Sequence, residues 1–161
     1  MGYILYRRCY YGKAKINNVL VSGLVAEGGA PQRILDAWLE GRFTLVTSLY
    51  LLEELVHVLT YPRIVQRLRV EEEELLAFLD ALVSKAEIVS GRLCLLGVTR
   101  DPKDDAVVAC AQEGEADYIV SGDQDLLVLE KYGDVQIISP REFLEILERD
   151  GADSLTPNPT G

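Results

Sequence analysis

The segment from Arg100 to Leu127 restricts the possible folds of this chain more than any other part of its sequence. Two acidic residues, Asp104 and Asp105, precede a run at 106–111 that is apolar on every side, which a helix on the protein surface would not tolerate. Tyr118–Val120 is a short apolar run typical of a strand that is buried on both faces. A buried helix that leads into a buried strand predicts a parallel α/β sheet.

The same alternation of helix and strand patterns extends along the rest of the chain. Further strands are predicted at 43–47, 86–89 and 135–138, and helices at 31–40, 49–60, 70–85 and 140–148, with a short basic helix after Pro62. The first strand is either Ile4–Tyr6 or Ala14–Ile16, and the pattern does not choose between them. The alternation predicts one α/β domain over residues 1–148, with a central parallel sheet covered by helices on both faces. Residues 149–161 are polar and rich in proline, which predicts a disordered tail.

Composition and charge exclude several classes of protein. With 161 residues and a formal net charge of −10, the chain cannot bind nucleic acid through net charge alone, so such a role needs a local basic patch or a bound cation. Three cysteines without a C-x-x-C pair argue against a disulfide framework and against a structural zinc site. No apolar run is long enough to span a membrane, and the N-terminus does not resemble a signal peptide, so a cytoplasmic protein is expected.

Three acidic side chains are predicted to meet at the carboxyl edge of the sheet. Asp123 directly follows the strand at 118–120, Asp105 begins a helix, and Glu54 lies in the helix after the strand at 43–47. Ligands bind at this edge in open α/β sheets. Mg²⁺ and Mn²⁺ prefer oxygen ligands, so these carboxylates predict a site for one of these ions, where phosphodiester hydrolysis is possible.

The acids of this region also have a purely structural interpretation. Asp104 and Asp105 can serve only to cap their helix, and Asp123 and Asp125 can be turn formers after Gly122. Glu54 can be a surface glutamate. A phosphatase-like enzyme built on Asp123 and Asp125 is a further alternative, although such enzymes carry their aspartate pair after the first strand. No glycine-rich phosphate-binding motif is present.

Five motifs, in this order, resemble the PIN (PilT N-terminal) domain family over about residues 16–147. They are N-V-L-V-S-G-L at 18–24, S-L-Y-L-L-E-E-L at 48–55, R-D-P-K-D-D-A-V-V-A-C-A at 100–111, A-D-Y-I-V-S-G-D-Q-D-L-L at 116–127 and I-I-S-P-R-E-F-L at 137–144. The branch that they resemble most is the VapC-like toxins of toxin–antitoxin pairs.

This resemblance implies a three-layer α/β/α ribonuclease that depends on Mg²⁺ or Mn²⁺, forms a homodimer and is inhibited by a cognate antitoxin. It also implies that Glu54, Asp105 and Asp123 form the acidic site, with Asp125 and Asn18 as additional members.

One position departs from the family pattern. The family has an aspartate, a primary metal ligand, at the end of its first strand, and here Ile16 takes its place. An isoleucine cannot coordinate a cation, so weak or absent cleavage is expected, and a catalytically degenerate module that binds an antitoxin or RNA is the alternative. Arg63, Arg67 and Arg69 are the candidates for contact with the RNA backbone.

Overall fold

The structure is a computed structural model that describes residues 5–6, 12–14 and 18–153. Its strands are short, and most follow or precede a helix. They are β1 (Leu5–Tyr6), β2 (Gly12–Ala14), β3 (Phe43–Ser48), β4 (Glu87–Val89), β5 (Tyr118–Val120), β6 (Lys131–Tyr132) and β7 (Val135–Ile138). The predicted strands at 43–47, 86–89, 118–120 and 135–138 are therefore confirmed, and β6 was not predicted.

The helices of the structure agree with the predicted ones within a few residues, apart from the end of the last helix, and they include a four-residue helix at 124–127 that was not predicted. They are α1 (Asn18–Val25), α2 (Ala30–Leu39), α3 (Leu49–Leu59), α4 (Pro62–Val65), α5 (Glu72–Lys85), α6 (Pro102–Glu113), α7 (Gln124–Leu127) and α8 (Pro140–Asp153). The predicted end of the last helix at Glu148 is wrong, because α8 continues to Asp153 and includes the first residues of the predicted tail. Residues 154–161 lie outside the described residues.

The strands form two neighbouring sheets with a parallel centre. The pairs β2–β3, β3–β4 and β5–β7 are parallel, whereas β1 pairs with β5 and β6 pairs with β7 in antiparallel orientation. Strand β1 also lies beside β2 and β3, so the two sheets are adjacent. Of the two candidates for the first strand, Ile4–Tyr6 overlaps β1, and Ala14–Ile16 overlaps β2 only at Ala14.

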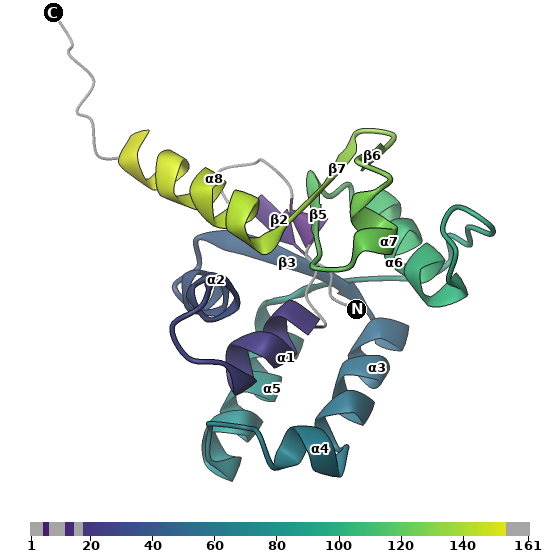
Figure 1. The fold of residues 1–161 in the computed structure, drawn as a ribbon. Helices are drawn as coiled ribbons and strands as arrows, with labels where there is room; N and C mark the ends of the chain where they lie inside the picture. Colours follow the sequence, from purple (N-terminus) through teal and green to yellow (C-terminus); the bar gives the residue numbers. More distant parts are fainter. Residues whose placement is uncertain (1–4, 7–11, 15–17, 154–161) are drawn as a thin grey trace, which may run out of the picture.

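Buried residues on neighbouring strand positions belong to two separate cores. Val120 and Leu45 pack in the core that includes α1, α2, α5 and α8, whereas Ile119 and Val46 pack in the core that includes α6 and α7. Successive strand residues point to opposite faces of a sheet, so helices cover both faces. The arrangement is a three-layer α/β/α fold, as the sequence predicted (Figure 1). Among the described residues, no helix is both long and apolar enough to cross a membrane.

Side-chain caps fix where the helices around the sheet edge begin. The Ser48 hydroxyl accepts the Leu51 N–H at the start of α3, and the Asp101 carboxylate accepts the Lys103 N–H at the start of α6. Pro102 occupies the first turn of α6, where its missing N–H costs nothing. These caps set the position at which α6 presents its two aspartates.

Candidate metal centre

Asp104 and Asp105 lie in the first turn of α6, and both are buried. Their side chains nevertheless have different surroundings. Helix α6 packs against β3 and β5, so its first turn lies beside the carboxyl ends of these strands. Asp123 follows β5 after two residues, and Glu54 lies in α3, which follows β3 directly. The elements predicted to carry the acidic site therefore do meet at one edge of the fold.

The Asp105 carboxylate binds the segment that precedes α6. Its Oδ2 accepts the Gly97 N–H at 2.9 Å, and its Oδ1 accepts the N–H of Thr99 at 2.6 Å and the hydroxyl of Thr99 at 2.9 Å. Burial raises the pKa of Asp105, but these hydrogen bonds outweigh it and lower the pKa below its ordinary value. Both oxygens are engaged by residues 97–99, so the geometry favours a structural role for the residue that the sequence predicted as a metal ligand.

Asp104 is the aspartate that faces the other acids. It is 1% exposed, and its Oδ1 is buried without a hydrogen-bond partner among the described residues. Its pKa is raised to about 6, mainly by burial and then by the negative charges of Asp123, Asp125 and Asp105. An unpaired carboxylate oxygen that faces other carboxylates is an arrangement that a bound cation would relieve.

Asp123 is held in place by the turn between β5 and α7. Its N–H donates to the Ser121 hydroxyl at 2.9 Å, and its Oδ1 accepts the Asp125 N–H at 2.9 Å, which makes Asp123 the cap of α7. The turn-forming interpretation of Asp123 is therefore confirmed, and it leaves Oδ2 for another partner. The Asp125 carboxylate is about half exposed and lies 3.8 Å from the Arg100 guanidinium.

Glu54 is partly buried and lies close to the first turn of α6. Its Oε1 is 3.7 Å from the Lys103 ammonium group. Ion pairs of this length between partly exposed groups contribute little to stability. A ligand of either charge can therefore displace them at small cost.

The described residues contain no group of three or more His, Cys, Asp or Glu side chains close enough to hold a metal ion. Neither the predicted trio of Glu54, Asp105 and Asp123 nor the same set with Asp104 in place of Asp105 is gathered closely enough. The chemistry of the donors still fits a hard divalent cation: all are carboxylate oxygens, and one of them, on Asp104, is buried and unpaired. Ile16 lies outside the described residues, and of Asn18 only the backbone is described, as the first residue of α1.

The spacing of the buried residues around α6 is a signal in the sequence that could have identified Asp104 as the aspartate that points toward the sheet. Residues three, four and seven positions after it are Val107, Val108 and Ala111, and all three are completely buried. Asp104 therefore begins the most buried stripe of the helix, which faces the sheet. Adjacent residues on a helix point about 100° apart, so the phase separates Asp104 from Asp105.

The three arginines predicted to contact RNA lie beyond the opposite end of α3. Arg63 is in α4, and Arg67 follows it. An 11-residue helix is about 16 Å long, so α4 is at least that far from the start of α3 beside the acids (Figure 1). The Arg69 guanidinium is paired with Glu27 at 2.7 Å. Contact between these arginines and RNA stays a prediction.

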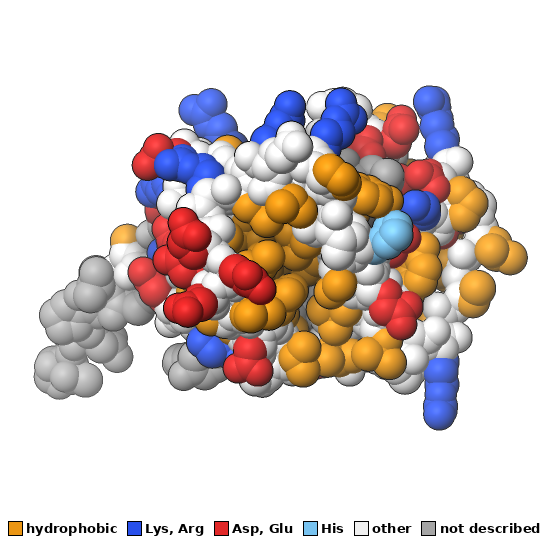
Figure 2. Space-filling view, turned by 90° about the horizontal axis from the view of Figure 1, so that it is seen from below, with side chains coloured by type: hydrophobic (Ala, Val, Ile, Leu, Met, Phe, Trp, Pro, Cys, Tyr) orange, Lys and Arg blue, Asp and Glu red, His pale blue; other side chains and the backbone are white. Residues whose placement is uncertain are grey.

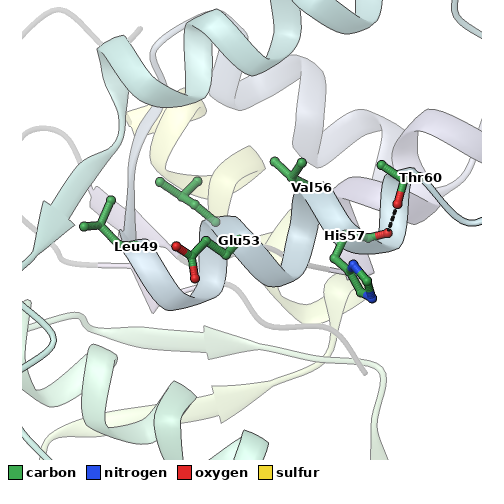
Figure 3. A pocket seen from close by; sticks show the side chains of 6 residues that line it. Leu49, Glu53, Val56, His57 and Thr60 are labelled. Carbon is green, nitrogen blue, oxygen red and sulfur yellow. Dashed lines mark hydrogen bonds between the residues drawn. The ribbon is translucent and has the colours of Figure 1, made fainter.

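An apolar hollow runs along one face of α3. Its volume is about 390 Å³, and Figure 3 shows the side chains that line it, among them Leu49, Glu53 and Val56. Leu49 and Val56 are 66% and 46% exposed. Figure 2 shows hydrophobic side chains gathered near His57 (pale blue), which lies at the same helix face.

Comparison with known proteins adds one match. A family model described as PIN domain matches residues 17–125, which is more than half of the chain. No curated protein and no solved structure matches the chain significantly. The matched region begins one residue after Ile16 and contains Glu54, Asp104 and Asp123.

Proposed function

Because the chain belongs to the PIN domain family, we propose that it is a metal-dependent ribonuclease whose metal ligands are Asp104, Asp123 and Glu54. PIN domains are generally nucleases that bind RNA and typically use divalent metals. The observation that carries the proposal is the Oδ1 of Asp104, which is buried without a hydrogen-bond partner in a carboxyl group whose pKa the charges of Asp123 and Asp125 raise. Asp105, predicted as a ligand, takes the role of a positioning residue instead.

The ligand set supports Mg²⁺ or Mn²⁺, since it offers only oxygen donors. Such an ion, when bound, activates water and stabilises the charge that develops on the phosphate. Asp104 and Asp123 would hold it, and Glu54 would join them directly or through water after release from Lys103. Asp125 would contribute negative charge at the edge.

Two cations beside the acids support binding of the substrate. Lys103 and Arg100 lie near Glu54 and Asp125, in pairs of 3.7 and 3.8 Å that are only loosely held. Because these ion pairs are weak, an RNA phosphate could replace the carboxylates as the partner of both cations, with or without a bound metal.

A catalytically degenerate binding module is the second candidate. Two observations favour it: no group of three metal-binding side chains is gathered among the described residues, and Ile16 replaces the aspartate that the family has. Such a module would still bind RNA or a protein partner but would lack site-specific uptake of Mn²⁺.

Cleavage of a single-stranded RNA in Mn²⁺, with titration calorimetry of the same ion, distinguishes these functions. The proposal predicts slow cleavage and one class of Mn²⁺ site, both removed by Asp104→Asn. Asp80→Asn, an exposed aspartate of α5, is the matched control and should change neither. Cleavage and Mn²⁺ binding that persist in Asp104→Asn would refute the proposed centre. RNA binding without Mn²⁺ uptake in the unmodified chain would establish the binding module.

The finer role that we propose is a toxin of a toxin–antitoxin pair, acting on cytoplasmic RNA as a homodimer. The resemblance to VapC-like toxins supports the toxin role, and the apolar hollow along α3 supports contact with a second copy of the chain. Light scattering should find a dimer that Val56→Glu dissociates and that Val83→Glu, a valine of α5 that is more exposed than Val56, does not. An inhibitor encoded beside the gene should abolish cleavage when it is co-expressed.

A further inference from the structure

A second cavity, of about 290 Å³, lies between the start of α3, the outer side of α6 and residues 91–96. Its walls are mainly apolar. The residues that line it include Ser48, Tyr50, Leu93, Pro102, Ala106, Ala109 and Glu113. We propose that this cavity binds one nucleobase of a single-stranded RNA, stacked on the ring of Tyr50, with the neighbouring phosphate at Lys103 and Arg100. The inference deepens the proposed function and rests on it.

The outer wall of the cavity is held in place before any ligand arrives, because two carboxylates of α6 bind the ends of the segment at 90–99. At one end, the Ser90 hydroxyl donates to Glu113 Oε1. At the other end, Asp105 accepts the N–H groups of Gly97 and Thr99. A cavity with walls already in place loses less conformational entropy on binding.

The electrostatics of Glu113 support the same conclusion. The Ser90 hydroxyl is the largest cause that lowers its pKa, followed by the peptide groups of Leu93, Arg92 and Gly91, which outweigh the effect of burial. Glu113 is therefore charged at neutral pH, and its hydrogen bond to the segment is charge-assisted. Gly91 and Gly97 both have φ near +71°, a conformation that favours glycine, so the chain turns at both ends of the wall.

The lining suits an aromatic base. Tyr50 is 45% exposed and offers part of its ring to the cavity, and the side chains of Leu93, Ala106 and Ala109 supply apolar surface around it. Proteins read single-stranded RNA by stacking its bases on aromatic rings. The volume lies at the lower limit of the roughly 300 Å³ typical of small-molecule pockets, which is adequate for one planar base.

The position of the cavity identifies which nucleotide it would bind. Ser48 ends β3 and Pro102 begins α6, so the cavity lies at the same sheet edge as the acids. Asp104 follows Pro102 by two residues, which turns it about 200° around the helix and away from the cavity. The bound base therefore belongs to a nucleotide that flanks the cleaved bond. Lys103 and Arg100 are exposed between the cavity and the acids of the proposed metal centre, and the phosphate that connects the two nucleotides would pass there.

The direct test is fluorescence anisotropy of a labelled single-stranded RNA in EDTA, which prevents cleavage. Tyr50→Ala should weaken binding about tenfold, and Tyr50→Phe, which keeps the ring, should not. Tyr61→Ala is the matched control, because Tyr61 is equally exposed and lies at the far end of α3. Thermal melts of each variant check that it folds.

A second arm replaces single nucleotides of the RNA by abasic ones. At one position of the RNA, an abasic nucleotide should weaken binding to the unmodified protein. The same abasic RNA should bind Tyr50→Ala no more weakly than the intact RNA does, because the stacking contact is already absent. Full affinity of Tyr50→Ala, or absence of RNA binding by the unmodified protein, would overturn the inference. A change in oligomeric state of Tyr50→Ala without a change in RNA affinity would show a protein-docking surface instead and would also overturn it.

The inference and the proposed catalysis fail in different ways. RNA binding that depends on Tyr50, without cleavage in Mn²⁺, would refute the ribonuclease and leave the base site intact. Cleavage that depends on Asp104, with Tyr50→Ala indistinguishable from the unmodified protein in RNA affinity, would refute only the base site.

Discussion

Asp104 and Asp105 are consecutive residues of α6, yet only Asp105 has both carboxylate oxygens in hydrogen bonds. Its oxygens accept three hydrogen bonds from Gly97 and Thr99, whereas Oδ1 of Asp104 is buried without a partner among the described residues. One carboxylate binds the segment before the helix, and one oxygen of its neighbour is left without a hydrogen-bond partner near other acids. A buried carboxyl group whose pKa is shifted by burial and by other charges is a frequent property of functional sites.

Asp105→Asn should destabilise the protein without removing its Mn²⁺ site. An asparagine has only one acceptor oxygen and would turn an N–H donor toward the N–H of Gly97 or Thr99. The free energy of unfolding, measured by urea denaturation, should fall by about 1–3 kcal/mol. Asp80→Asn serves again as the control. Unchanged stability together with loss of Mn²⁺ binding would instead support the role that the sequence predicted for Asp105.

The stability of the metal-free protein should carry a pH dependence that belongs to Asp104. Its pKa is raised from 3.8 to about 6, so the folded state binds more protons than the unfolded state between these values. The contribution of the Asp104 carboxyl group to the free energy of unfolding is therefore full below pH 3.8 and is lost as the pH rises through 6. The unmodified protein should therefore lose stability relative to Asp104→Asn as the pH rises. Its free energy of unfolding minus that of Asp104→Asn should fall by at most about 3 kcal/mol from pH 4 to pH 7.

This difference isolates Asp104, because other shifted acids act in the opposite direction. The pKa values of Asp105, Glu113 and Glu142 are lowered, so their contributions are lost as the pH falls, and they are present in both proteins. Mn²⁺ should abolish this loss of stability of the unmodified protein with rising pH, since a bound cation favours the charged form of the Asp104 carboxylate. A difference that does not vary with pH would contradict the assignment of Asp104.

Gly114→Ala should destabilise the contact between α6 and the sheet. A Cβ atom at this position would lie 2.4 Å from Val46 Cγ1 and 3.2 Å from Val89 Cγ1, and Val46 is completely buried. Relief of this overlap must move the helix or the strand, at a cost of about 1–3 kcal/mol in thermal or urea unfolding. Gly122→Ala, where a Cβ meets nothing within 4 Å, should leave stability nearly unchanged. Equal effects of the two substitutions would show that packing is not the cause.

Ile16→Asp should increase cleavage of RNA in Mn²⁺. The resemblance to the PIN family implies an aspartate at this position, and the substitution would add a fourth carboxylate to the proposed centre. We expect a gain of at least about tenfold in kcat together with tighter Mn²⁺ binding. Ile16→Asn, similar in size but uncharged, is the control. A rate that stays unchanged with Ile16→Asp would indicate that the described acids do not act with this position.

The fold was predictable from local patterns to a large extent. Alternation of apolar residues and helical spacing located β3, β5, β7 and the helices around them, because each pattern records which side of an element is buried. The antiparallel pairings of β1 and β6 were not predicted, since two-residue strands carry too little pattern. The end of α8 was misplaced because its last turns are polar, and a polar composition also describes an exposed helix.

By itself, the sequence determined that this is an α/β protein with acidic residues at the start of a buried helix and after a buried strand. These properties depend on periodicity and on residue type, which are local. Only the tertiary structure distinguished Asp104 from Asp105, because their hydrogen bonding depends on where residues 97–99 return along α6 and offer their N–H groups. The carboxylate of Asp105 finds such donors, whereas one oxygen of Asp104 does not.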